Sequence, residues 1–174
     1  VEALAGHLGI GRAQKAGPPA ASYTLKDGHL SVKGNIHLGL SGSASLFRQE
    51  GGTSRLDNFI FTNSVGRVEL AGGQLYADYE GVITRTASSS VFAFSGGTYL
   101  SSTNRDAHFA ASRLELSGTP TLQVGQRFYF PANMVIADDT VFTVCSKSGS
   151  GGAYIETGLE QEVTGELVVT NSYF

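Results

Sequence analysis

The sequence predicts an all-β protein, a β-solenoid (parallel β-helix) of about seven coils, and three observations carry this prediction. First, an apolar stretch, a Gly-Gly or Asp-Gly turn and a second apolar stretch recur along the chain. The last turn residues fall at positions 28, 52, 73, 97, 119, 139 and 165, a mean period near 23 residues. Second, the apolar residues between turns alternate with polar ones, as in half-buried strands. Third, glycine supplies 23 of the 174 residues, well above the usual ~7 per cent. An internal period of this size is typical of stacked coils.

The first 21 residues differ from the rest, and we expect an N-terminal cap or arm over 1–21. Leu4 and Leu8 lie at helical spacing, and the Gly17-Pro-Pro-Ala20 segment would end a helix. Residues 22–174 then form the solenoid domain, with a Gly/Ser-rich loop at 146–152. Beyond the loop, we expect a hairpin-like pair of strands at 153–156 and 162–170.

Each period of about 23 residues holds two or three short strands, which suits a coil with two or three flat faces. The recurrent glycine is expected at a corner, where the chain needs a positive φ or room for the backbone of the next coil. This structural turn role is assigned to Gly28, Gly52, Gly73, Gly97, Gly118 and Gly165. The alternative fold is a β-sandwich or jelly roll, which also spaces short strands every ~8–12 residues.

Two consecutive segments resemble the repeats of large secreted bacterial proteins. They are Tyr23-Thr-Leu-Lys-Asp-Gly-His-Leu-Ser-Val-Lys-Gly-Asn-Ile-His-Leu-Gly39 and Ser41-Gly-Ser-Ala-Ser-Leu-Phe-Arg-Gln-Glu-Gly-Gly-Thr53. The family is that of autotransporter-passenger-like β-solenoids, including those of proteins with PEP-type C-terminal sorting signals. The match is good over 23–53, fair over 66–100 and poor past 113. These motifs specify a coil and carry no catalytic residue. The resemblance implies an extracellular or cell-surface scaffold.

Composition excludes several classes of function. The net charge is −3 and the basic residues occur singly, so nothing favours nucleic acid as a partner. The apolar stretches are far shorter than the ~20 residues that cross a bilayer, so we expect no membrane insertion. The lone Cys145 rules out an internal disulfide framework, and the four histidines form no metal-type pair. We therefore expect no metal site and no cofactor.

Acidic residues are the remaining candidates for chemistry, because stacked-coil polysaccharide lyases and glycosidases bring carboxylates from neighbouring coils together. The carboxylate candidates are Asp57, Asp78, Glu80 and Asp106, and the cation candidates are Arg55, Arg85 and Arg105. Their spacing selects none of them, so solvated surface positions are the preferred interpretation. The adjacent Asp138 and Asp139 align with the corner occupied by Asp27 and Gly28, which indicates turn residues rather than an acid/base pair.

The sequence thus favours a structural protein without catalytic residues: an extracellular subunit of a self-assembling fibre or surface scaffold. A short solenoid exposes unpaired strand edges at both ends, and end-to-end contacts between copies generate filaments. The candidate assembly strand is Glu166, Leu167, Val168 and Val169, so deleting 1–21 or placing Lys at Val168 is expected to abolish assembly. The alternative is a module that binds or cleaves polysaccharide, or a slice of a longer adhesin. A groove with three or more convergent Asp, Glu or Arg side chains would favour the carbohydrate module.

Overall fold

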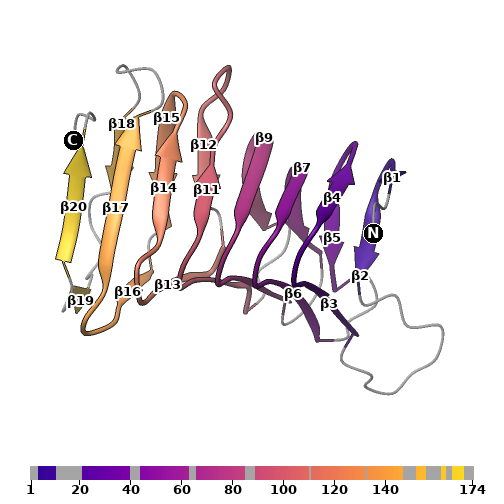
Figure 1. Ribbon diagram of the computed structural model, residues 1–174, viewed down its shortest axis with the longest axis horizontal. Coiled ribbons are helices and arrows are strands. Elements are labelled where there is room, and N and C mark those ends of the chain that lie inside the picture. The colour runs from indigo at the N-terminus through magenta and orange to yellow at the C-terminus, as the bar shows by residue number, and fades with distance from the viewer. Residues whose placement is uncertain are drawn as a thin grey trace.

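A computed structural model describes residues 4–10, 21–39, 44–62, 66–84, 89–109, 111–131, 133–146, 152–155, 162–163 and 166–170. All regular elements in these ranges are β-strands. They wind into a β-solenoid with a period of about 23 residues, as the sequence predicts. Figure 1 shows the coils side by side along the long axis, with the N-terminal and C-terminal strands at opposite ends.

Each coil contributes strands to three faces, two of which belong to one 13-stranded sheet and the third to a 7-stranded sheet. Face 1 holds β1 (Leu4–Ala5), β4 (His29–Val32), β7 (Thr53–Phe61), β9 (Gln74–Thr84), β11 (Thr98–Leu100), β14 (Thr121–Val124), β17 (Val141–Ser146) and β20 (Glu166–Thr170). Face 2 holds β2 (Leu8–Ile10), β5 (Ile36–Leu38), the second halves of β7 and β9, β12 (Ala107–Phe109), β15 (Arg127–Phe130) and β18 (Gly152–Ile155). Face 3 is the smaller sheet: β3 (Ala21–Leu25), β6 (Ser45–Gln49), β8 (Gly66–Leu70), β10 (Val91–Phe94), β13 (Arg113–Leu116), β16 (Met134–Ile136) and β19 (Glu162–Val163).

Neighbouring coils pair through parallel strands on all three faces. Face 3 carries seven strands, one for each of the seven coils expected from the sequence. About five turns are complete, and β1 to β3 and β17 to β20 extend the sheets at the two ends. The structure therefore has the parallel ladder of a solenoid rather than the antiparallel sheets of a sandwich or jelly roll.

The N-terminal segment differs from the expectation of a cap or arm. Residues 4–10 form β1 and β2, which pair in parallel with β4 and β5 and so begin the first coil. The spacing of Leu4 and Leu8 reflects a corner at Gly6 and His7 between two strands, and not a turn of helix. Residues 11–20 lie outside the described part of the chain.

The C-terminal segment also differs from the expected hairpin. The strand β18 pairs with β15 on face 2, β19 with β16 on face 3, and β20 with β17 on face 1, all in parallel. These three strands lie on successive faces and continue the solenoid by a further coil. Their apolar residues follow the same spacing as in the earlier coils. Of the expected Gly/Ser loop at 146–152, Ser146 ends β17 and Gly152 begins β18, and the residues between them lie outside the described part of the chain.

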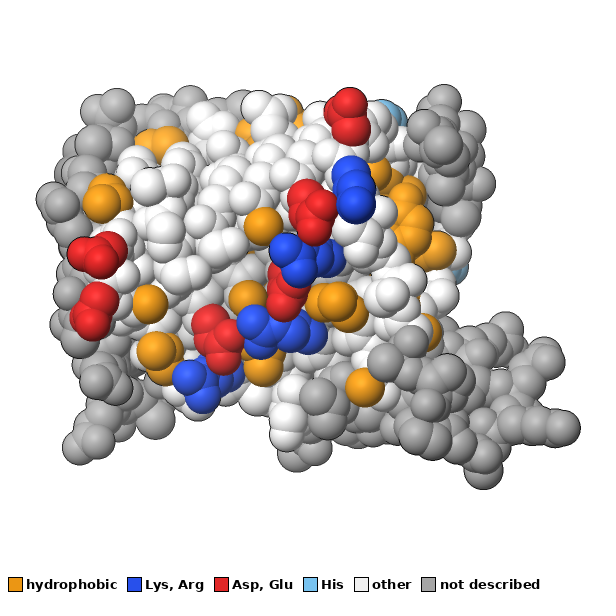
Figure 2. Space-filling view, turned by 60° about the horizontal axis from the view of Figure 1, so that its bottom comes forward, with side chains coloured by type: hydrophobic (Ala, Val, Ile, Leu, Met, Phe, Trp, Pro, Cys, Tyr) orange, Lys and Arg blue, Asp and Glu red, His pale blue; other side chains and the backbone are white. Residues whose placement is uncertain are grey.

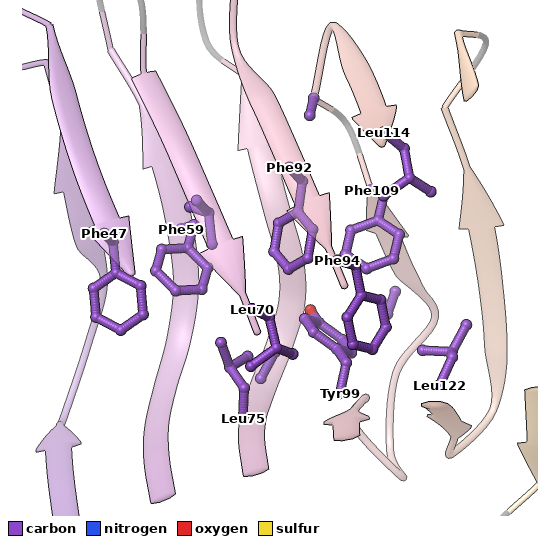
Figure 3. Close-up of a cluster of buried hydrophobic side chains, with 14 of the residues drawn as sticks. Phe47, Phe59, Leu70, Leu75, Phe92, Phe94, Tyr99, Phe109, Leu114 and Leu122 are labelled. Atoms are coloured by element: carbon purple, nitrogen blue, oxygen red, sulfur yellow. The ribbon is translucent and has the colours of Figure 1, made fainter. Parts of the chain in front are cut away.

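The interior is packed with aromatic rings from all three faces (Figure 3). Phe92 on face 3 lies 4.6 Å from Phe109 on face 2, and Phe109 lies 4.6 Å from Phe128 on the next coil, both between ring centroids. Tyr99 on face 1 completes this cluster at 5.0 Å from Phe109. Contacts of this kind add ~0.5–1.5 kcal/mol per pair beyond the burial of apolar area. The core is thus tied together both across the coils and along the axis.

Candidate functional site

The corner between face 3 and face 1 carries the predicted turn glycines. Five of them have positive φ: Gly28 (85°), Gly52 (66°), Gly73 (75°), Gly97 (76°) and Gly118 (66°). A side chain at Gly73 is disfavoured by the positive φ of this residue. Its Cβ would also collide with the carbonyl oxygen of Gly52 on the preceding coil. The sixth predicted residue, Gly165, lies outside the described residues. These positions maintain the coil and offer no chemistry.

The adjacent acids occupy the same corner one coil later. Asp138 and Asp139 form an exposed turn, and Asp139 has a φ of 61°. Aspartate tolerates this left-handed conformation better than most residues. The placement fits turn residues.

A buried polar cluster behind this corner was not anticipated from the sequence. The side chain of Gln49 is fully buried, and its Nε2 donates to the carbonyl of Gln74 at 3.0 Å and to that of Gly52 at 3.3 Å. Its Oε1 accepts a hydrogen bond from Ser54 Oγ at 2.5 Å. The glutamine therefore links two coils and satisfies its own polar atoms, which makes its burial tolerable.

Two of the candidate charged residues meet on face 1. Arg55 Nε lies 2.5 Å from Asp78 Oδ2, and its second nitrogen, Nη2, donates to Oδ1 at 3.1 Å. This hydrogen bonding, with the charge of Asp78, raises the pKa of the Arg55 guanidinium. The pair lines a pocket of about 340 Å³ together with Tyr76 and the segment 100–104.

Two further candidates line a second pocket, of about 380 Å³, on the other side of the 101–106 loop. Arg105 places its Cζ 4.1 Å from the centre of the Tyr79 ring and donates to the Tyr79 hydroxyl at 3.1 Å. Asp106 and His108 line the same pocket, and His108 stacks on Tyr129 with ring centroids 4.6 Å apart.

The other candidates are not brought to either pocket by the described contacts. Asp57 is half-buried at the register shift within β7, where its N–H donates to the carbonyl of Gly34 at 2.9 Å. The side chain of Glu80, and Arg85 as a whole, lie outside the described residues.

Face 3 carries an ion-pair network that sequence reasoning missed. We call it the Arg/Glu ladder: Arg48, Glu50, Arg67, Glu69, Arg113 and Glu115. Figure 2 shows alternating basic and acidic side chains crossing this surface. The contacts run from Arg48 to Glu50 (2.9 Å) and Glu69 (3.5 Å), and from Arg67 to Glu69 (2.6 Å). Part of the signal was available in the sequence, since Arg67-Val-Glu69 and Arg113-Leu-Glu115 occupy the same register positions two coils apart. Arg48-Gln-Glu50 is displaced by two residues, which places Arg48 opposite Glu69.

The Arg/Glu ladder crosses one strand of face 3, β10, that has no charged side chain. Val91 and Ala93 on β10 occupy the register positions that hold Arg and Glu on β8 and β13. Arg67 Nη1 reaches over this coil to Glu115 Oε2 at 3.0 Å, across two steps of ~4.8 Å each. Because Ala93 is small, a shallow groove of about 440 Å³ remains above it, lined by three arginines and two glutamates of the ladder.

This groove meets the criterion of three convergent charged residues that would favour a carbohydrate module. Its carboxylates are engaged, however. Glu69 contacts Arg48 and Arg67, and Glu115 contacts Arg67 and Arg113 at 3.2 Å. A general acid requires surroundings that keep the carboxyl group protonated, such as an apolar pocket or a second carboxylate. The ladder instead surrounds each carboxylate with cations, so it is suited to structural pairing.

The predicted assembly strand forms β20, the last strand of face 1. It pairs in parallel with β17, with Phe142 opposite Leu167 and Thr143 opposite Val168. In the described residues β20 has no further strand on its outer side, and β1 is likewise outermost at the opposite end.

The described residues contain no group of three or more His, Cys, Asp or Glu that would hold a metal ion. No helix long and apolar enough to cross a membrane occurs in the part of the chain that the structure describes. Partial burial raises the pKa of the Cys145 thiol, which lowers its thiolate fraction.

Comparison with known proteins gave no match: no family model, no curated protein and no solved structure resembles the chain significantly.

Proposed function

We propose that this chain is a structural protein, the subunit of an extracellular fibre or surface scaffold that assembles by end-to-end stacking of solenoids. The observation that supports this proposal is that each end strand of face 1 pairs on its inner side only, within the described residues. Both sheets run in parallel register from one end to the other, and in the described residues β1 and β20 are the outermost strands of face 1. Each therefore presents a row of backbone donors and acceptors at its outer edge.

The polarity of the strands makes the two ends complementary. Because neighbouring coils are all parallel, a second copy placed beyond β20 can present its β1 in the same strand direction and continue the ladder. Such a contact joins two different surfaces of the subunit, so it is heterologous. Heterologous contacts do not close on themselves unless they form a ring, and they otherwise extend into a filament.

An extracellular or cell-surface location belongs to the same proposal. Only 16% of the residues are charged, and the outward positions of face 1 hold a column of hydroxyl residues. Register places Thr98, Thr121 and Thr143 side by side on three successive coils. A weakly charged, hydroxyl-rich surface is compatible with dense packing against neighbouring fibres, since it carries little net repulsion.

Polysaccharide cleavage is less well supported. A glycosidase needs two carboxyl groups on either side of one bond. Among the described candidates, Asp78 is held by Arg55 in one pocket and Asp106 lines the other. This arrangement gives no reason to assign a catalytic pair.

The test is static and dynamic light scattering of the purified chain over a concentration series, with two substitutions at Val168. Val168→Lys places a charge on the edge strand and is expected to prevent growth of the scattering mass. Val168→Thr, which keeps a β-branched side chain, is expected to assemble as the unchanged chain does. Deletion of 1–21 is not a clean test, because it removes β1 and β2 from the first coil.

Two results would contradict the proposal. A chain that stays monomeric at every concentration would argue against stacking and favour a slice of a longer adhesin. Equal assembly of both variants, with unchanged circular dichroism, would show that β20 does not make the joint.

A further inference from the structure

One corner of the solenoid carries an insertion. Between face 1 and face 2, residues 101–107 separate two positions, Leu100 and His108, whose register partners on the preceding coil are Tyr76 and Gly81. Only residues 77–80 span that earlier corner. On the following coil, residues 124–128 lie between the corresponding partners. The 101–107 corner is thus longer than the same corner on the preceding and following coils, and it projects beyond both at the top of Figure 1.

An insertion that the two neighbouring coils lack is not required by the repeat. In solenoids such insertions map to loops on one face, which is often the binding face. Here the loop is flanked on both sides by a polar pocket, one of about 340 Å³ and one of about 380 Å³. Asn104, an exposed residue of the loop, lines both pockets. The two pockets are therefore adjacent subsites rather than unrelated hollows.

The side chains in these pockets are held in place before any ligand arrives. Asp78 fixes the guanidinium of Arg55 through two hydrogen bonds. The ring of Tyr79 supports Arg105, and the ring of Tyr129 lies almost parallel to that of His108, at 10°. Pre-positioning of this kind lowers the entropic cost of binding.

Two exposed carboxamides add hydrogen-bonding capacity to the pockets. The side chains of Asn104 and Gln126 make no hydrogen bond within the described residues, and both residues are exposed. Each carboxamide offers donors and an acceptor in one plane.

The chemistry of the pockets defines the class of ligand. Each pocket holds one arginine and one aspartate, so the formal charges balance and neither a polyanion nor a polycation is favoured. The linings are mainly polar, which argues against a lipid or an apolar cofactor. Guanidinium, carboxylate and carboxamide groups beside tyrosine rings are complementary to neighbouring hydroxyls on a sugar ring. We propose that the two pockets bind adjacent sugar residues of a neutral polysaccharide, without cleaving it.

This site is independent of stacking, because all its residues belong to one chain and lie on four central coils. Its test is ¹H–¹⁵N NMR titration of the full chain with four neutral hexasaccharides: cellohexaose, laminarihexaose, maltohexaose and chitohexaose. An oligogalacturonate of the same length is the charged comparison. We expect saturable shifts at the 101–106 loop with at least one neutral hexasaccharide at millimolar concentration.

Two exposed substitutions in the loop, Asn104→Ala and Arg105→Ala, are expected to weaken that binding by about tenfold or more. Lys26→Ala is the matched control, since it removes an exposed cation at the corner between faces 3 and 1, and its affinity should be unchanged. Melting curves of the variants check that each is folded.

Failure of all four neutral sugars to bind would overturn the proposal, as would binding that both loop substitutions leave intact. Binding of the oligogalacturonate alone would overturn the assignment of a neutral ligand.

Discussion

Asn58 and Asn35 lie one above the other on adjacent coils, and Asn58 Nδ2 donates to Asn35 Oδ1 at 2.9 Å. The Oδ1 of Asn58 in turn accepts the backbone N–H of Gly81 on the third coil at 3.0 Å. One buried side chain thus connects three coils at the corner between face 1 and face 2. It does so where β7 shifts register between Leu56 and Asn58, so that the irregular backbone keeps its polar groups paired.

Asn58→Ala is expected to lower the free energy of unfolding by about 1–3 kcal/mol, because it leaves the buried N–H of Gly81 without its acceptor. Urea unfolding measures the change. Asn133→Ala removes an exposed asparagine and should alter stability by less than about 0.5 kcal/mol. Equal effects of the two substitutions would refute the role of the Asn58 link.

Tyr99→Phe is expected to stabilise the fold by about 1 kcal/mol. The Tyr99 side chain is fully buried, and within the described residues its hydroxyl has no hydrogen-bond partner. The substitution removes an unsatisfied polar atom and keeps the ring in the aromatic cluster. Tyr76→Phe is the control, since the Tyr76 hydroxyl donates to Gln74 at the surface, and it should not raise the melting temperature. A lower melting temperature for Tyr99→Phe would show that the hydroxyl is satisfied.

Alkaline pH should destabilise the unchanged chain more than Tyr99→Phe. Burial raises the pKa of Tyr99 above its ordinary value near 10. Above about pH 10, Tyr99 loses its proton in the unfolded chain but keeps it in the folded chain. The stability of the fold therefore falls as the pH rises. The contribution of one such group is ~1.4 kcal/mol per pH unit. Urea unfolding at about pH 9 and about pH 11 measures it, and parallel losses in both proteins would contradict this prediction.

Gly73→Ala is expected to cost at least about 2 kcal/mol, because alanine is strained at a φ of 75° and its Cβ meets the carbonyl of Gly52. Gly6→Ala is the matched control, since a Cβ at Gly6 has no atom within 4 Å. Thermal unfolding of both variants gives the comparison. A neutral Gly73→Ala would mean that this corner can rearrange without loss.

Arg67→Ala is expected to destabilise the chain by about 1 kcal/mol at low salt, and Arg113→Ala by about half as much. Arg67 contacts Glu69 and Glu115, whereas Arg113 contacts only Glu115 among the ladder residues. Partial burial lowers the pKa of Arg67, but its hydrogen bonds to the two glutamates outweigh this and raise it. The free energies of unfolding of the two variants should differ less at about 1 M salt than at low ionic strength, because salt screens the ion pairs. A difference that salt leaves unchanged would indicate lost packing instead.

The sequence predicted the features that depend on local periodicity. The spacing of the turns and the alternation of apolar residues indicated a parallel solenoid, and the glycines at 28, 52, 73, 97 and 118 have the positive φ that a tight corner requires. Local chemistry decides these features, since a left-handed residue packed against the next backbone is almost always glycine. The first coil was missed because the spacing of Leu4 and Leu8 across a corner imitates a helical turn.

The candidate sites depended on information that one sequence does not hold. Which side chains become neighbours is decided by register between coils, and register depends on the length of each corner. The pairing of Arg67 with Glu115 skips a coil only because Ala93 is small. Likewise, Arg105 meets Tyr79 only because the 101–106 loop folds back over the preceding coil. Both relationships require the fold before they can be recognised.

The most direct test of the stacking proposal is negative-stain electron microscopy of the purified chain over a concentration series. We expect unbranched filaments one solenoid wide, whose length increases with concentration, because in this proposal the β20 end of one copy pairs with the β1 end of the next. Particles of single-chain size at every concentration would contradict it.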